Sequence, residues 1–141
     1  MTARKETGFL REINLVKENL LDWRVISLDK LRQTMGVSPD DDQGAVANQA
    51  KAIAKEYMRV GQSFVWNATN LSRQLRGMLI SLFAGYQGSI RIVYLEAPWE
   101  ELLHRNRDRA AKIPEKVLSR MKNRLEVPDI TEAQQVDWIV D

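Results

Sequence analysis

The sequence has no cysteine and a single histidine, His104. Without cysteine the chain forms neither a disulfide framework nor a thiolate metal site. One imidazole also argues against zinc, because a histidine-based zinc site normally uses two or three such ligands. No apolar run reaches membrane-spanning length, and the N-terminus lacks the pattern of a signal peptide. We therefore expect a cytoplasmic protein without a membrane partner.

The chain has 141 residues, of which 44% are hydrophobic and 28% charged, a composition typical of a globular protein with its own core. No linker or repeat interrupts it, so we expect one domain over residues 1–141. The formal net charge is only +2, but eight cationic side chains between Arg105 and Arg124 accompany just two acidic ones. This block is either a solvated helix face or a phosphate-binding surface, and both interpretations stay open.

Apolar periodicity predicts short strands that alternate with helices. The strands are expected at residues 25–26, 63–66, 90–95 and 136–140. The helices are expected at 7–21, 29–36, 38–60, 71–83, 98–109 and 114–125. This alternation predicts an α/β fold with a mainly parallel sheet covered on both faces, a three-layer αβα sandwich.

The stretch at residues 24–32 holds the first candidate site. A β-branched half predicts a short buried strand, and the second half starts a helix at Asp29. Asp29 and Arg32 are three residues apart, so they share a face of the first helical turn. They are thereby expected at the C-terminal edge of a sheet, where open α/β folds bind ligands. The alternative is that Asp29 merely caps the helix beside a solvated arginine.

Four short patterns follow one another along the chain. D-x-x-R comes after the first strand, N-A-T-N after the second, A-P before a helix that carries R-N-x-x-R, and I-P-E at the next helix. In this order they resemble the P-loop kinases of the polynucleotide kinase and zeta-toxin type, often described as AAA-type ATP-binding domains. The resemblance covers nearly the whole chain. It implies a P-loop NTPase fold and transfer of the γ-phosphoryl group of ATP, with Mg²⁺, to a hydroxyl such as a nucleic-acid 5′-OH.

The resemblance also implies roles for residues near the acceptor. Asp29 matches the general base that accepts the proton of the attacking hydroxyl, and Arg32 matches a contact to the acceptor's phosphate. The polar turn matches a D-x-T-N pattern, although Asn67 stands where aspartate is usual. The matching substrate-binding residues of this turn and the following helix are Asn67, Thr69, Asn70 and Arg76. The alternative for the turn is an ordinary Asn/Thr helix cap.

The R-N-x-x-R pattern matches a lid over the donor phosphates, within a region at about residues 98–125. Arg105 and Arg109 are four residues apart and are expected on one helical face, able to close over the nucleotide. This interpretation assigns a function to the basic block. Solvated surface remains the alternative, above all for Lys122 and Arg124.

The phosphate-binding loop of this family, G-x-x-x-x-G-K-[ST], has only a partial counterpart. Lys5 and Thr7 match its phosphate-binding lysine and its Mg²⁺-binding hydroxyl, but Arg4 stands where the last glycine belongs. Only four residues precede Lys5, so we expect the first strand and most of the loop to be absent or truncated. A plain helix start is the alternative for Lys5 and Thr7.

Three explanations of that departure stay open: a fragment of a longer protein, a truncated gene product, or a degenerate relative. In this fold the missing strand lies mid-sheet, so its neighbours would need an upstream segment or a second copy of the chain to cover their edges. The leading hypothesis is an ATP-dependent phosphotransferase that acts on a polynucleotide 5′-OH, whether or not this chain is active. Its competitors are a non-catalytic binder of nucleic acid or of a partner, and a small-molecule kinase.

Overall fold

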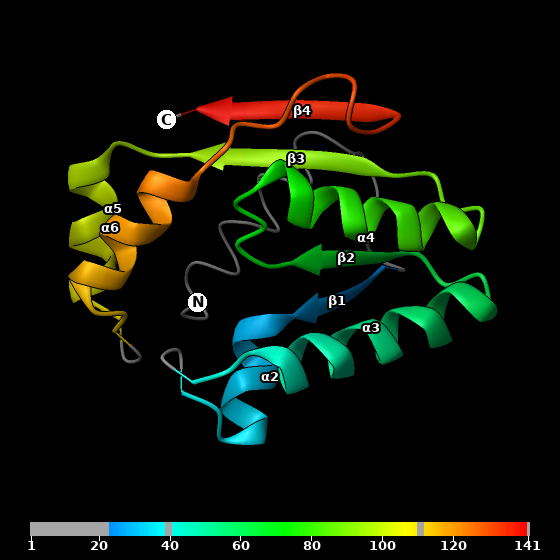
Figure 1. The fold of residues 1–141 in the computed structure, drawn as a ribbon, viewed down its shortest axis with the longest axis horizontal. Helices are drawn as coiled ribbons and strands as arrows, with labels where there is room; N and C mark the ends of the chain where they lie inside the picture. Colours follow the sequence, from blue (N-terminus) through cyan, green and yellow to red (C-terminus); the bar gives the residue numbers. More distant parts are fainter. Residues whose placement is uncertain (1–22, 39–40, 110–111, 141) are drawn as a thin grey trace. The chain divides into compact units, whose positions relative to one another are not determined.

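A computed structural model describes residues 23–38, 41–109 and 112–140 (Figure 1). Lys5, Thr7 and the helix predicted at 7–21 lie outside these ranges. The described residues belong to two compact units, an N-terminal unit within Asn19–Thr69 and a C-terminal unit that begins at Asn70. Each unit is described by itself. The single domain over residues 1–141 stays a prediction.

The N-terminal unit is a strand–helix–helix–strand unit. Its elements are β1 (Arg24–Ser27), α2 (Leu28–Met35), α3 (Gly44–Arg59) and β2 (Phe64–Asn67) (Figure 1). The two strands pair in parallel, with Ile26 opposite Trp66 and Ser27 opposite Asn67. Both strands therefore end at the same edge, and α2 and α3 form the crossover that a parallel pair requires.

The core of the N-terminal unit lies between α3 and β1, which contact one another. Ile26 of β1 is buried together with three residues that recur every four positions along α3, namely Val46, Ala50 and Ala54. Positions four apart share a helix face, and two of the three are alanines, so this face can approach the strand closely. Tyr57 extends the contact to β2, with its ring centroid 5.9 Å from that of Phe64.

Helix α2 begins one residue earlier than the sequence predicts. Ser27 is its N-cap, with the hydroxyl oxygen accepting a 3.3 Å hydrogen bond from the Lys30 backbone N–H. The alternative in which Asp29 caps this helix is therefore wrong, because Asp29 lies inside the first turn. The helix ends at Gly36, as predicted, where a φ of +68° suits glycine.

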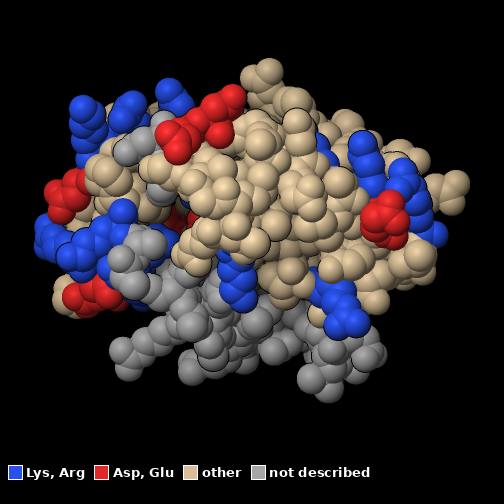
Figure 2. Space-filling model, turned by 90° about the horizontal axis from the view of Figure 1, so that it is seen from below, with Lys and Arg blue, Asp and Glu red and all other residues tan. Residues whose placement is uncertain are grey.

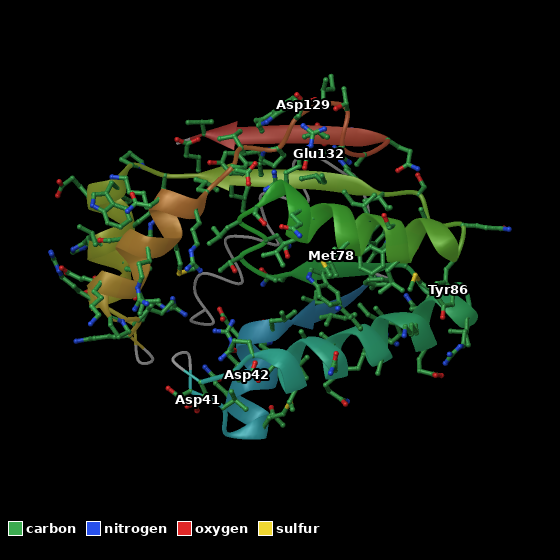
Figure 3. All side chains as sticks on the ribbon, viewed as in Figure 1. Asp41, Asp42, Met78, Tyr86, Asp129 and Glu132 are labelled. Carbon is green, nitrogen blue, oxygen red and sulfur yellow. The ribbon has the colours of Figure 1, made fainter. Side chains whose placement is uncertain are left out.

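Helix α3 begins later than predicted, at Gly44 and not at Ser38. Two aspartates of the preceding turn use their carboxylates locally (Figure 3). Asp41 accepts from the Ser38 N–H at 3.0 Å, and Asp42 accepts from the Gly44 N–H at 2.9 Å. Such side-chain bonds to nearby backbone compete with helix formation, which explains the late start.

The C-terminal unit contains the remaining elements. They are α4 (Arg73–Gly85), β3 (Arg91–Glu96), α5 (Trp99–Arg107), α6 (Glu115–Arg124) and β4 (Gln135–Val140). Strands β3 and β4 pair in parallel over their whole length, and an ion pair of 2.6 Å between Arg91 and Asp137 crosses the pair. The α/β class with parallel strands is thus confirmed, whereas the three-layer sandwich stays a prediction. Within the described ranges no helix is both long and apolar enough to cross a bilayer.

Candidate functional site

Asp29 and Arg32 form an ion pair on the first turn of α2. Nη2 of Arg32 lies 2.7 Å from Oδ1 of Asp29, and their side chains are 19% and 25% exposed. The spacing of three residues brings them together, as the sequence predicts. Partial exposure leaves the pair open to a ligand from solvent, while the contact holds both groups in one geometry.

The strand register places this pair beside the polar turn. Ser27 immediately precedes α2 and lies opposite Asn67, the last residue of β2. Both of these polar residues are buried. The first turn of α2 and the turn after β2 therefore leave the sheet at the same C-terminal edge, where Thr69 is exposed. This edge carries Asp29, Arg32, Asn67 and Thr69, four of the predicted acceptor-site residues.

The polar turn does not cap the helix that follows it. Ser72 is the N-cap of α4, and its hydroxyl oxygen accepts a 3.2 Å hydrogen bond from the Leu75 N–H. The alternative in which an Asn or Thr of residues 67–70 caps this helix is therefore wrong. Asn70 instead has a φ of +44°, in the left-handed region that asparagine tolerates better than most residues.

Arg76, in the first turns of α4, is held inside the C-terminal unit. It is 6% exposed, and its Nε and Nη2 atoms lie 3.1 Å and 3.4 Å from the Glu132 carboxylate, which is 4% exposed. Nη1 donates to the carbonyls of Asn70 and Leu71 at 3.0 Å and 3.1 Å. A contact from Arg76 to the acceptor, as predicted, would require this buried pair to break.

Glu132 belongs to a hydrogen-bonded turn between α6 and β4 (Figure 3). Its Oε2 atom accepts from the Asp129 N–H at 2.6 Å. The Asp129 carboxylate accepts from the N–H and the hydroxyl of Thr131, each at 2.8 Å, and these bonds lower the pKa of Asp129. Arg73 also contacts the Thr131 hydroxyl at 3.3 Å. The start of α4 is therefore fastened to a turn about sixty residues further along the chain.

The predicted lid arginines do not share one helix. Helix α5 ends at Arg107, and the Arg109 N–H donates to the carbonyl of Asn106, three residues back, at 3.3 Å. Such a tight turn breaks the four-residue periodicity, so the expectation of one common helical face is wrong. Arg105 forms an exposed ion pair of 2.8 Å with Glu101, while Arg109 is half-buried.

Asn106 lies in the last turn of α5, and the sequence assigned it no role. It is 6% exposed. Its Nδ2 atom donates to the Ile113 carbonyl at 2.7 Å, and its Oδ1 atom accepts from the Ile113 N–H at 3.0 Å. This two-bond contact closes the connection between α5 and α6. The signal was its place inside R-N-x-x-R, whereas nothing local pointed to Glu132.

No group of three or more histidine, cysteine, aspartate or glutamate side chains gathers as a metal site in the described part of the chain. Mg²⁺ in phosphoryl-transfer sites is held by few protein ligands, by waters and by the phosphates themselves. The protein ligand predicted for it, Thr7, lies outside the described residues. The described residues therefore offer no protein cage for the metal.

A comparison with protein families gives an independent result. The model of a family described as an AAA domain matches residues 13–128, well over half of the chain. The matched range contains the Asp29–Arg32 pair, the polar turn and the R-N-x-x-R pattern. It begins after Lys5 and Thr7, so the roles of these two residues stay predictions.

Proposed function

Since this chain belongs to the AAA domain family, a nucleotide-binding family of P-loop NTPase type, we propose that it serves ATP-dependent phosphoryl transfer to a hydroxyl acceptor. A polynucleotide 5′-OH is the proposed acceptor. One observation carries the proposal: a partly exposed carboxylate–guanidinium pair stands at the C-terminal edge of a parallel strand pair. Open α/β sheets bind their ligands at this edge.

Each member of the pair has a chemical task in this reaction. As the oxygen–phosphorus bond forms, Asp29 accepts the proton that leaves the acceptor hydroxyl. Arg32 donates its fork of N–H groups to a phosphate of the acceptor strand, and Asn67 and Thr69 hydrogen-bond to the same strand. ATP, with Mg²⁺, supplies the phosphoryl group when bound.

The proposed donor contacts are Lys5, Thr7, Arg105 and Arg109. Among them, Arg105 has a carboxylate partner that a nucleotide would displace. Its pair with Glu101 is 41% and 46% exposed, and exposed pairs of this kind contribute about 0.5 kcal/mol or less. A triphosphate therefore competes easily for Arg105.

The decisive test is phosphoryl transfer from γ-labelled ATP to a 5′-OH oligonucleotide with Mg²⁺. Asp29→Ala should abolish transfer and leave ATP binding unchanged, because the base acts on the acceptor. Glu56→Ala is the matched control, since Glu56 also pairs with an arginine three residues along a helix, Arg59. Unchanged turnover in Asp29→Ala, or equal losses in both variants, would contradict the assignment.

Calorimetric titration of the chain with Mg·ATP separates the proposal from its competitors. Binding together with transfer to the oligonucleotide supports it. Binding of ATP with transfer only to a sugar, nucleoside or antibiotic would indicate a small-molecule kinase. Oligonucleotide binding that depends on salt, without any effect of ATP, would indicate a non-catalytic nucleic-acid binder.

A further inference from the structure

The basic block divides into two parts with different partners. On α5 the cations are engaged: Arg105 pairs with Glu101, and Arg107 pairs with Glu115 at 3.1 Å. On α6 four cations are exposed and lie in no ion pair with any described residue, and three of them are four residues apart. These three, Lys116, Arg120 and Arg124, are called the α6 basic stripe.

The stripe has the geometry of a linear cationic surface. Its members are four residues apart, so they follow one side of the helix over about 12 Å. Charges this close act together, since the Debye length at physiological salt is about 8 Å. Figure 2 shows Lys and Arg side chains over the α5–α6 region, at the left of the view, with Asp and Glu side chains among them.

No acidic side chain of the described residues forms an ion pair with the stripe. The single acidic residue of α6 is Glu115, which Arg107 already engages. Lys122, on another side of the helix, lies with Nζ 4.5 Å from the centroid of the Trp99 ring. The three cations of the stripe can therefore pair with an anionic partner without breaking an ion pair of the described residues.

The burial of the apolar side of α6 helps to distinguish between a lipid surface and a nucleic acid as that partner. Val117, Leu118 and Met121 are half-buried, and the stripe is exposed on the side away from Leu118. Insertion into a lipid surface needs exposed apolar side chains on the contacting face of a helix. A repeating, flexible polyanion needs only exposed, evenly spaced cations, and the stripe supplies these.

We propose that the α6 basic stripe binds the phosphate backbone of a single-stranded nucleic acid. The inference rests on the proposed function, because the strand bound here is the acceptor polynucleotide. It assigns the exposed cations of α6 to nucleic-acid binding. The stripe contacts phosphates, so it favours no particular base sequence.

The test uses fluorescence anisotropy with a 3′-labelled, 5′-OH single-stranded oligonucleotide at several salt concentrations. The variant Lys116→Gln/Arg120→Gln/Arg124→Gln keeps good helix-forming residues. We expect about a tenfold or greater loss of affinity at low salt, and a salt slope smaller by about 2, at about 0.7 for each cation lost.

Helix α3 offers a control matched in spacing and charge, because Lys51, Lys55 and Arg59 are also four residues apart, with the two lysines half-buried and Arg59 paired with Glu56. Changing these three to Gln removes the same charge and should change affinity by less than about threefold. Equal losses of affinity in both triple variants, or no loss in the α6 variant, would overturn the proposal. It would also be overturned if the α6 variant lost binding to anionic vesicles but kept binding to the oligonucleotide.

The same protein samples separate this proposal from the proposed function. Oligonucleotide binding through α6 in a chain that neither binds Mg·ATP nor transfers phosphate would support the stripe and contradict the kinase. Transfer that proceeds with an unchanged KM for the oligonucleotide in the α6 variant would support the kinase and overturn the stripe.

Discussion

Two arginine–carboxylate pairs, one in each unit, differ in burial more than in chemistry. Arg32 and Asp29 are three residues apart on one helical turn, and each remains about one-fifth to one-quarter exposed. Arg76 and Glu132 are 56 residues apart, and only 6% and 4% exposed. The family resemblance assigned both arginines to the acceptor.

The difference in burial separates a candidate site, Asp29–Arg32, from a structural ion pair, Arg76–Glu132, which is called the clamp. A partly exposed pair exchanges its partner for a ligand at a lower cost than a buried pair, because solvent reaches it. A buried pair cannot, since removing one partner leaves a charge without compensation in the interior. Arg76 and Glu132 therefore hold the turn at Asn70 and Leu71, while solvent still reaches the pair of Asp29 and Arg32.

The largest effect is expected from breaking the clamp. Glu132→Gln leaves the Arg76 guanidinium buried beside a neutral group, and should lower the free energy of unfolding by about 3–5 kcal/mol. Urea denaturation followed by circular dichroism measures this. Arg76→Met/Glu132→Met removes both charges and should regain part of the loss. A double variant less stable than Glu132→Gln would contradict the clamp.

A smaller loss should follow from opening the connection between α5 and α6. Asn106→Ala leaves the Ile113 N–H and carbonyl without their side-chain partner, which costs about 2 kcal/mol. The measurement is again urea denaturation. Asn123→Ala, at an exposed position of α6, should stay within about 0.5 kcal/mol of the parent chain. Equal effects at the two asparagines would show that the Asn106 bonds add nothing.

The partly exposed pair of Asp29 and Arg32 should matter less for stability than the buried pair, which sharpens the contrast with Glu132. Asp29→Asn and Arg32→Gln are each expected to change the free energy of unfolding by less than about 1 kcal/mol. If transfer activity is present, the same substitutions should reduce it severely. A stability loss as large as that of Glu132→Gln would place this pair with the clamp and remove the reason for regarding it as a site.

The smallest effect is expected on stability at alkaline pH, through Tyr94, whose pKa Arg76 influences. Burial, followed by the charge and the hydrogen bond of Glu96, raises the pKa of Tyr94 above 10.0, and the Arg76 cation opposes this rise. The folded state thus favours the neutral form of the Tyr94 phenol, and this preference contributes to stability. Its contribution is complete below the pKa of the unfolded chain, about 10, and is lost as pH rises through the folded value.

Thermal melting between neutral pH and pH values above 10 checks this expectation. The parent chain should lose more melting temperature on alkalinisation than Tyr94→Phe does. In Arg76→Met/Glu132→Met, absorbance titration should place the Tyr94 ionisation higher than in the parent, because the opposing cation is gone. An unchanged or lower value would mean that Arg76 has no influence on this phenol.

Features that depend on near neighbours were predictable from the sequence. The strand at residues 25–26, the end of α2 at Gly36 and the Asp29–Arg32 pair all follow from residues within one or two turns. The start of α3 was missed even so, because Asp41 and Asp42 bond to turn backbone where a first helical turn was expected. Acidic residues before a helix fit both arrangements.

By itself the sequence determined the alternation of strands and helices, the order of the family patterns and the local pairing of Asp29 with Arg32. Only the tertiary structure decided that Arg76 is buried against Glu132, and that Asn106 bonds to Ile113 while α5 ends before Arg109. The physical reason is that a buried polar group bonds to whichever segment folds against it. Spacing along the chain carries no record of a partner 56 residues away.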